Sequence, residues 1–278
     1  MYEILSKKEI APAIWTIRVK AERLAQAAQP GQFLIVVANE QSERIPLTIC
    51  DYNAQEGTVT IVVQAIGLST DKIVAMPIGS SFVGFVGPLG HASEFANQEI
   101  GEIINKRFLF VAGGLGAAPV YPQVKWLKEH GIEAHVILGA KNENSVIMED
   151  EFRALTPHVH VATDDGSRGF HGLVTALMKD LIAKGETFDQ VIAIGPMIMM
   201  KFVALTTREF NIPTIVSLNT LMVDGTGMCG ACRVTVAGKV RFACVEGPEF
   251  DGHLVDFDEA MRRMGMYKEQ ENHKCKIR

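Results

Sequence analysis

Three cysteines and an aspartate near the carboxyl end have the spacing of an iron–sulfur site. The stretch Asp224-Gly-Thr-Gly-Met-Cys229-Gly-Ala-Cys232 is followed by Cys244, which gives the pattern D-x4-C-x2-C-x11-C. Plant-type [2Fe–2S] clusters use C-x4-C-x2-C and a distant fourth cysteine, so aspartate here takes the first position. Thiolates suit iron because they are soft, anionic donors. The spacing of Cys229, Cys232 and Cys244 therefore predicts a [2Fe–2S] cluster.

Zinc and disulfide bonds are the alternatives for these cysteines. A zinc site would use a second C-x2-C or a Cys/His pair at comparable spacing, and the chain has neither, although His253 could serve as a ligand. Disulfide pairing among three cysteines leaves one of them unpaired. The iron–sulfur interpretation is therefore favoured. Whether Asp224 is the fourth ligand stays open at this point, because Asp-Gly is also an ordinary turn dipeptide.

A hairpin after the motif would bring the last cysteine back to the others. The segments Arg233–Val236 and Val240–Ala243 have strand character, and Ala237-Gly238-Lys239 between them is a turn signal. The glycines between Asp224 and Cys232 allow tight folding, with backbone N–H groups free to point at the sulfides.

The whole chain has the composition of an ordinary globular protein. Its 278 residues are enough for two or three domains, with 47% hydrophobic and 21% charged residues and a net charge of −5. This charge gives no electrostatic footprint for nucleic acid. The longest apolar run, Val191–Met200, is broken by Gly195-Pro196 and is too short to span a bilayer. Clustered cysteines and a start without an apolar signal core lead us to expect a cytoplasmic protein.

Residues 1–98 have the pattern of a small antiparallel β-barrel, with short strands separated by turn signals. One short helix is expected at Ser69–Ala75, where Ser69 or Thr70 could cap it. The predicted strands are Ala13–Ala21, Gln32–Ala38, Arg44–Tyr52, Thr58–Ile66 and Ser80–Val86.

Two places in this barrel could hold a flavin. The run Arg44-Ile-Pro-Leu-Thr48 offers a cation and a hydroxyl on an apolar strand. The run Gly67-Leu-Ser69-Thr70 lies where a strand passes into a helix start, which is a natural cradle for phosphate. Each signal is weak alone, since such residues are usually surface or capping residues. Cys50 beside the first run is expected to be a small buried apolar residue.

Strands and helices alternate in the middle of the chain, which predicts a parallel sheet with helices on both faces. After the first strand comes the turn Gly113-Gly114-Leu115-Gly116-Ala117-Ala118-Pro119, which would let the backbone approach a pyrophosphate at a helix N-terminus. Its spacing is not that of the usual dinucleotide fingerprint. The predicted strands are Phe108–Ala112, Ala134–Leu138, His158–Thr163, Gln190–Ile194 and Thr214–Val216. The predicted helices are Val120–Glu129, Asp150–Leu155, Leu173–Ala183 and Met197–Phe210.

Two more loops follow strands of this sheet at the ends where such folds bind ligands. One contains Asp164 and Asp165, and the other is Gly195-Pro196-Met197. The acidic loop would repel a 2′-phosphate, so NADH is favoured over NADPH. The alternative is that Asp164-Asp165-Gly166 is merely a turn.

The order of barrel, pyridine-nucleotide domain and [2Fe–2S] segment resembles the ferredoxin–NADP reductase superfamily over nearly the whole length. The resemblance implies a mixed fold with three parts: a FAD-binding β-barrel (1–98), an NAD-binding α/β domain (99–220), and a small cluster segment with a tail (221–278). The matching residues are Pro30-Gly31-Gln32-Phe33, Arg44–Thr48, Gly67–Thr70, Gly87-Pro88-Leu89-Gly90, Gly113–Pro119 and Gly195-Pro196-Met197.

The resemblance also implies roles for single residues. FAD would lie across the barrel face, with Leu47 in place of a stacking aromatic and the catalytic Thr48 facing flavin N5. The superfamily's arginine would fall on Ile45, so Arg44 is displaced by one position. The implied FAD contacts are Arg44, Pro46, Leu47, Thr48, Gln64, Ile66, Gly67, Ser69 and Thr70. The implied NAD(H) contacts are Gly113, Gly114, Gly116, Ala117, Pro119, Asp164, Asp165, Gly195, Pro196 and Met197.

Within the superfamily, Asp224 favours one branch. Small subunits of the electron-bifurcating NADH-dependent reduced ferredoxin:NADP oxidoreductases look the same there, whereas electron-transfer subunits of dihydroorotate dehydrogenase B normally keep four cysteines. The first resemblance implies Asp224 as a cluster ligand, hydride exchange between NADH and FAD, and one-electron transfer through the cluster. It also implies a heterodimer with a large flavoprotein and iron–sulfur subunit, where ferredoxin and NADP(H) react. The tail Met261–Arg278 could dock there or be a solvated helix. The dihydroorotate relative, or another NADH-dependent electron-supply module, is the alternative.

Overall fold

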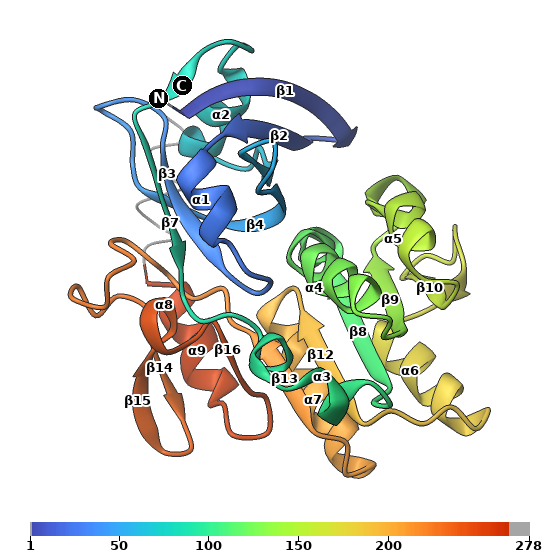
Figure 1. The fold of residues 1–278 in the computed structure, drawn as a ribbon. Helices are drawn as coiled ribbons and strands as arrows, with labels where there is room; N and C mark the ends of the chain where they lie inside the picture. Colours follow the sequence, from blue (N-terminus) through green and yellow to red (C-terminus); the bar gives the residue numbers. More distant parts are fainter. Residues whose placement is uncertain (1, 267–278) are drawn as a thin grey trace.

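The amino-terminal part is a nearly closed antiparallel β-barrel, as predicted (Figure 1). The computed structural model describes residues 2–266. The seven strands of the barrel sheet follow the order β6-β1-β2-β5-β4-β3-β7. They are β1 (Tyr2–Ala11), β2 (Ile14–Lys20), β3 (Phe33–Val37), β4 (Ile45–Asn53), β5 (Thr58–Gln64), β6 (Ser81–Phe82) and β7 (Gly84–Leu89); two helices, α1 (Glu22–Ala27) and α2 (Leu68–Ala75), accompany them.

Two elements of the barrel were not predicted. Strand β1 pairs with β2 through two register shifts, and only Ile4 among its ten residues is buried. Its sequence therefore lacks the apolar alternation that marks a half-buried strand. Helix α1 has six residues, which is too short for a helical period to show.

The second sheet is parallel with helices on both faces, which confirms the α/β prediction. Its order is β11-β10-β9-β8-β12-β13-β16, and only the β13–β16 pair is antiparallel. The strands are β8 (Phe108–Gly113), β9 (Ala134–Ala140), β10 (Val159–Thr163), β11 (Phe170–His171), β12 (Gln190–Ile194), β13 (Thr214–Ser217) and β16 (Glu249–Asp251). The helices are α3 (Ile100–Ile103), α4 (Ala117–Glu129), α5 (Glu149–Leu155), α6 (Val174–Ala183) and α7 (Met197–Glu209), with 3₁₀ turns η1 (Glu94–Asn97), η2 (Gly114–Gly116) and η3 (Glu143–Ser145).

Side chains of β8 divide between two cores. Phe108 and Phe110 pack with α4 and α5, whereas Leu109 and Val111 pack with α6 and α7. This is the alternation expected of a strand covered on both faces. The first core also includes Cys50 of β4, which is 2% exposed, so the barrel packs directly against the α4 side of the sheet. Lys125 of α4 forms an ion pair with Asp51 of β4 at 2.7 Å.

The carboxyl-terminal part contains the predicted hairpin. Strands β14 (Arg233–Val236) and β15 (Lys239–Phe242) are joined through Ala237-Gly238, and α8 (Ala243–Glu246) follows at once. Helix α9 (Phe257–Met264) lies against α7, and β16 extends the second sheet. The predicted cluster segment therefore contributes β16 to the α/β sheet. The division into three domains stays a prediction.

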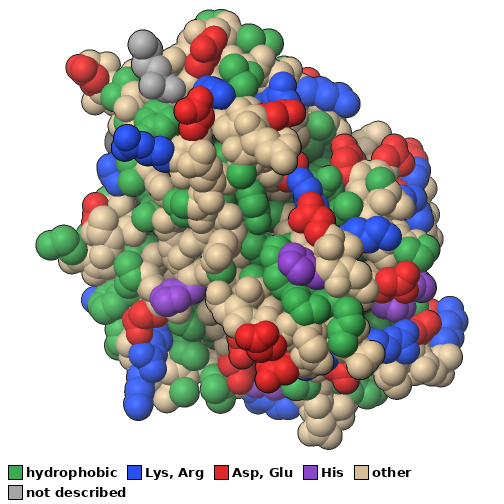
Figure 2. All heavy atoms as spheres, in the orientation of Figure 1, with side chains coloured by type: hydrophobic (Ala, Val, Ile, Leu, Met, Phe, Trp, Pro, Cys, Tyr) green, Lys and Arg blue, Asp and Glu red, His purple; other side chains and the backbone are tan. Residues whose placement is uncertain are grey.

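Charged side chains of both signs are interspersed over the face shown in Figure 2.

Among residues 2–266, no helix combines the length and apolar character that crossing a bilayer requires. Most of the proposed tail, Met261–Arg278, lies outside the described residues.

Candidate functional site

Glycines give the Asp224–Cys232 loop its shape. Gly225, Gly227 and Gly230 have φ of 82°, 81° and 65°, in the left-handed region that other residues rarely adopt. A Cβ on Gly225 would lie 3.0 Å from Leu89 of β7 and 3.1 Å from Ile35 of β3. The loop is therefore pressed against the barrel.

The hairpin brings two of the predicted ligands together, as expected. The Sγ atoms of Cys232 and Cys244 are 3.2 Å apart, and both residues are 1% exposed. The backbone N–H of Cys244 donates to Cys232 Sγ at 3.4 Å. Burial, followed by the neighbouring Cys232, raises the pKa of Cys244 to about 12. A metal must displace that proton, because thiolate is the form that binds.

The other two predicted ligands are not gathered with this pair. Cys229 is exposed, and the Asp224 carboxylate accepts a hydrogen bond from the Thr226 hydroxyl. Within residues 2–266, no three His, Cys, Asp or Glu side chains are close enough to hold a metal ion together. The donor set still fits a [2Fe–2S] cluster, because two buried free thiols face each other and a glycine-rich loop carries the other two donors.

Arg44 contacts the cluster loop. Its Nη2 donates to the backbone carbonyl of Asp224 at 3.0 Å. The residue lies just before β4, so this bond joins the predicted flavin strand to the predicted cluster loop across 180 positions. The sequence assigned Arg44 to FAD, and that role stays a prediction.

The second predicted flavin motif, at the start of α2, is bonded to the residue just before the first motif. The Ser69 hydroxyl donates to Glu43 Oε2 at 2.6 Å, which joins the segment before β4 to this helix. The Thr70 hydroxyl accepts from the backbone N–H groups of Ile66 and Gly67, each at 3.1 Å. Thr70 thus fixes the shape of the turn. The Ile66 side chain is 76% exposed.

The middle of β4 carries the remaining flavin candidates. Leu47 and Thr48 pair with Leu34 and Phe33 of β3, and both are partly buried. Pro46 pairs with Ile35, while Gln64 ends β5 opposite Ile14. Helix α4 packs on the same strand.

Two of the predicted NAD(H) loops touch at the carboxyl edge of the parallel sheet. A Cβ on Gly195 would lie 3.0 Å from the Gly113 backbone, and a Cβ on Gly116 would overlap the Ile194 carbonyl. Strand β8 lies between β9 and β12. The strands that follow β8 in sequence are first added on one side of it (β9, β10, β11) and then on the other (β12, β13), so the strand order reverses at β8. Ligands bind at such switch points in open α/β sheets. The remaining predicted contacts are close in sequence to these glycines: Gly114 lies in η2, Ala117 and Pro119 lie in the first turn of α4, and Pro196 and Met197 begin α7.

The acidic loop after β10 lies farther along the same edge. Asp164 and Asp165 are exposed, and Asp165 Oδ1 accepts from the N–H and hydroxyl of Ser167 at 2.9 and 2.6 Å. The hydrogen bonds from Ser167 lower the pKa of Asp165, so its carboxylate stays charged.

One partly buried carboxylate, that of Glu249, has no signal in the sequence analysis. Glu249 Oε1 accepts from Ser93 Oγ and from Gln123 Nε2, each at 2.9 Å. A Cβ on Gly31 would lie 3.0 Å from the same oxygen. Barrel, α/β sheet and carboxyl-terminal segment meet at this point. No local pattern signals it, because the partners are 156 and 126 positions away.

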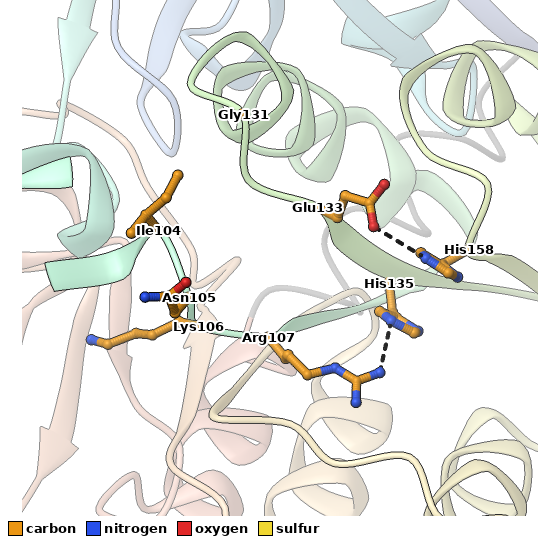
Figure 3. A pocket seen from close by; sticks show the side chains of 8 residues that line it. All are labelled: Ile104, Asn105, Lys106, Arg107, Gly131, Glu133, His135 and His158. Carbon is orange, nitrogen blue, oxygen red and sulfur yellow. Dashed lines mark hydrogen bonds and ion pairs between the residues drawn. The ribbon is translucent and has the colours of Figure 1, made fainter. Parts of the chain in front are cut away.

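A surface pocket of about 400 Å³ lies at the opposite edge of the sheet (Figure 3). Arg107 precedes β8, and Glu133 precedes β9, so both mark the amino ends of these strands. His135 and His158 stack with ring centroids 4.2 Å apart. Burial, followed by His158 and Arg107, lowers the pKa of His135 to about 4. Ligands of parallel sheets bind at the other edge, so this pocket is separate from the predicted cofactor loops.

Two families match the chain. Residues 110–205 match the oxidoreductase NAD-binding domain, and residues 219–256 match the iron–sulfur cluster binding domain of dihydroorotate dehydrogenase B. The chain is 45% identical over 269 residues to a Thermotoga maritima protein described as a dihydroorotate dehydrogenase B (NAD(+)) electron transfer subunit homolog. The match covers 97% of this chain and 92% of that protein. Identity to the Bacillus caldolyticus electron transfer subunit is 32%, covering 89% and 94%.

A solved structure of the NADH-dependent reduced ferredoxin-NADP oxidoreductase, described for its insights into flavin-based electron bifurcation, contains a similar chain. It has 42% identity and a TM-score of 0.91, and the match covers 100% of this chain and 98% of that one. Phthalate dioxygenase reductase, with 17% identity and a TM-score of 0.57, shares the fold over 91% of this chain and 76% of its own. These likenesses confirm the predicted cofactors, which are FAD, NAD(H) and a [2Fe–2S] cluster. The chain belongs to the ferredoxin–NADP reductase superfamily, among its NAD(P)H-linked flavin and iron–sulfur electron-transfer subunits.

Proposed function

We propose that this chain is the small subunit of an electron-bifurcating NADH-dependent reduced ferredoxin:NADP oxidoreductase. The observation that carries the proposal is the full-length likeness to that enzyme's chain, with 42% identity, on a protein whose cluster motif begins with Asp224. By this proposal, the partner is a large subunit at which ferredoxin and NADP(H) react. Its cellular location is proposed to be the cytoplasm.

Different predicted site residues are proposed to bind NAD(H) and FAD. Gly113, Gly116 and Gly195 let backbone approach the pyrophosphate of NAD(H), and the α4 N-terminus favours its negative charge. Thr48 presents its hydroxyl on β4, and Thr70 shapes the turn that holds the flavin phosphates. When bound, the flavin accepts hydride from NADH and releases electrons singly, which the one-electron cluster requires. Orientation is the main demand on the protein, because hydride transfer needs no general base.

The barrel connects the two redox sites. Phe33 and Ile35 of β3 pack in one apolar cluster with Cys232 and Cys244. Strand β3 is paired along its length with β4. Strand β3 and its apolar contacts therefore lie between the β4 residues that would hold the flavin and the cysteines that would hold the cluster.

Asp224 is proposed as the fourth cluster ligand. Carboxylate is a harder and less covalent ligand than thiolate, so Asp224→Cys should change the EPR g-values of the reduced cluster. Asp224→Ala should change them too, or lower the iron and sulfide content. If both variants gave wild-type g-values, Asp224 would leave the ligand set.

Co-expression tests the proposed partner. The chain should co-purify with an untagged glutamate-synthase-like large subunit, and the complex should couple NADH, ferredoxin and NADP. The alternative is the electron-transfer subunit of a dihydroorotate dehydrogenase B, favoured by the description of the Thermotoga maritima relative. Orotate formation in a pair with a dihydroorotate dehydrogenase catalytic subunit, without binding to the large subunit, would overturn the first assignment.

A further inference from the structure

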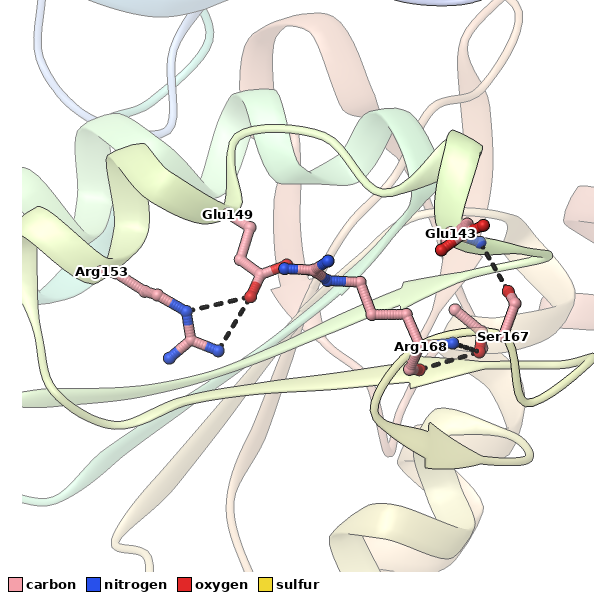
Figure 4. Close-up of polar contacts among 6 residues, drawn as sticks. Glu143, Glu149, Arg153, Ser167 and Arg168 are labelled. Atoms are coloured by element: carbon pink, nitrogen blue, oxygen red, sulfur yellow. Dashed lines mark hydrogen bonds and ion pairs between the residues drawn. The ribbon is translucent and has the colours of Figure 1, made fainter.

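A carboxylate, Glu149, lies between two arginines beside the acidic loop of the NAD(H) edge (Figure 4). Its Oε1 accepts from Arg153 Nε at 2.9 Å, and its Oε2 accepts from Arg168 Nε at 2.7 Å. The Glu149 side chain is 10% exposed, whereas the two arginines are 48% and 51% exposed. Burial acts to raise the pKa of Glu149, but hydrogen bonds from Arg168 and Arg153 outweigh it and hold the pKa below its ordinary value.

Hydrogen bonds within the loop after β10 fix the backbone position of Arg168. The hydroxyl of Thr163, which is 0% exposed, accepts from Arg168 N at 3.0 Å and donates to Arg168 O at 2.8 Å. Gly169 has φ of 69°, and a Cβ there would overlap the Val161 carbonyl. The backbone of Arg168, three residues after Asp165, is therefore held in one position, and its side chain extends from that fixed point.

This point belongs to the edge where the nucleotide is proposed to bind. The loops after β9 and β10 are joined because Glu143 N donates to Ser167 Oγ at 2.8 Å (Figure 4). Both follow the carboxyl ends of parallel strands. The exposed charges of these loops, besides Arg168, are Lys141, Glu143, Asp164 and Asp165.

A free arginine at this edge would suit NADPH. Guanidinium groups bind phosphate through paired, charge-assisted hydrogen bonds. Here Glu149 already takes Nε–H donors from both arginines and neutralises part of their charge. A nucleotide 2′-phosphate would meet guanidinium groups whose charge Glu149 already partly neutralises, and it would also approach Asp164 and Asp165. A 2′-hydroxyl carries no charge and meets neither obstacle.

We propose that Glu149 is a specificity-determining residue, which excludes a 2′-phosphate by holding Arg168 and Arg153. This inference rests on the proposed placement of NAD(H) at the edge formed by the Gly113 turn and the Asp165 loop. It assigns the choice of cofactor to Glu149 of α5, which lies outside the acidic loop and holds Arg168 of that loop.

The decisive variant is Glu149→Gln, which keeps the shape of the side chain and removes its charge. Two guanidinium groups would then lie close together without the carboxylate that bonds to both of them, which favours an anion. Affinity for 2′,5′-ADP, measured by calorimetry, should rise about tenfold. Affinity for 5′-AMP, which lacks the 2′-phosphate, should change by less than about twofold.

Two controls isolate the arginine. The double variant Glu149→Gln with Arg168→Gln should lose the gain in 2′,5′-ADP affinity. The matched variant Glu209→Gln removes another carboxylate of this sheet's helices, paired with Lys179 at 2.8 Å, and should leave both affinities unchanged. Flavin reduction should follow the same trend, with a higher NADPH-to-NADH ratio of rates in Glu149→Gln alone.

The outcomes separate this inference from the proposed function. A folded Glu149→Gln protein without any gain for 2′,5′-ADP overturns the inference, even where NADH reduces the wild-type flavin. A wild-type flavin that NADH leaves oxidised overturns the proposed function instead. If Glu149→Gln does not fold, Glu149→Asp takes its place. Its shorter carboxylate releases at least one arginine and should give a smaller gain in the same direction, and no gain overturns the inference.

Discussion

At the scale of single residues, Arg44 changes the interpretation of the flavin strand. The sequence pattern of a cation followed by Thr48 suggested a phosphate contact, with the arginine one position out of register. In the structure the guanidinium reaches the Asp224 carbonyl at 3.0 Å. A hydrogen bond from a charged donor to a backbone carbonyl is stronger than one from a neutral donor, so it stabilises the conformation of the loop. Arg44 therefore contributes to the order of the cluster loop.

Replacing Arg44 with Gln should weaken the hold on the Asp224 loop. We expect the cluster to be lost about threefold faster in the presence of an iron chelator, which corresponds to one exposed charge-assisted hydrogen bond. The decay of cluster absorbance measures this rate. Arg18→Gln, which breaks the barrel ion pair with Glu56, should decay like the wild type. A weaker affinity for FAD with an unchanged decay rate would return Arg44 to the phosphate site.

The spacing of the cysteines predicted the kind of cluster, but the sequence did not predict the individual side-chain contacts around it. The D-x4-C-x2-C-x11-C pattern is local, and the hairpin signal placed Cys244 beside Cys232 correctly. The bond between Arg44 and Asp224 spans 180 positions, and that between Ser69 and Glu43 spans 26. Such contacts depend on how the strands pack, so no periodicity in the sequence carries them.

At the scale of elements, two turns at the end of β8 and β12 are packed backbone to backbone. Gly116 has φ of −60°, so its backbone conformation alone would admit other residues. Glycine is required at position 116 by the lack of space for a side chain, because a Cβ would overlap the Ile194 carbonyl oxygen. At Gly113 a Cβ would instead overlap the flexible end of Met199 and lie 3.0 Å from Cδ of Pro196. The same glycine-rich run therefore contains one position that cannot change and one that can adjust.

Alanine at these two positions should have unequal effects. We expect Gly116→Ala to lower the free energy of unfolding by about 3 kcal/mol, because backbone atoms must move apart. Gly113→Ala should cost less than about 1 kcal/mol, since the Met199 side chain can change rotamer. Urea unfolding of both variants measures the difference. Equal losses would show that the close approach at Gly116 does not limit the fold.

Elements with a strong local signal were predicted closely. Strand β12 was expected at Gln190–Ile194 and is found there, because its apolar run lies between clear breaks. Helix α4 was expected from Val120 but begins at Ala117, since Pro119 is compatible with the first helical turn. Strand β16 has three residues, and its place in the sheet depends on pairing with β13. Long-range pairing of so short a segment leaves no local pattern.

At the scale of the whole molecule, Glu249 lies where the three parts of the chain meet. Burial raises its pKa to about 7 from an ordinary value of 4.5, although Ser93 and Gln123 donate to it. Between these pH values the native carboxyl holds a proton that the unfolded chain has released. Its contribution to the free energy of unfolding therefore falls as pH rises through this window.

Comparison of the wild type with Glu249→Gln isolates that contribution. The stability of the wild type relative to the variant should decrease by about 1 to 3 kcal/mol between pH 4.5 and pH 7.5. His135 acts in the opposite direction over a similar window, because its pKa is lowered to about 4. Its effect is common to both proteins and cancels in the difference. Urea unfolding at several pH values provides the measurement, and a constant difference would show that Glu249 titrates normally.

We propose that NADH delivers electrons through FAD to a [2Fe–2S] cluster on this chain. The most direct test is anaerobic titration of the purified protein with NADH, followed by absorbance and EPR together. We predict that the flavin absorbance bleaches and that the EPR signal of a reduced [2Fe–2S] cluster rises. Protein that is colourless and free of acid-labile sulfide, even after reconstitution with iron, sulfide and FAD, would rule out this electron path.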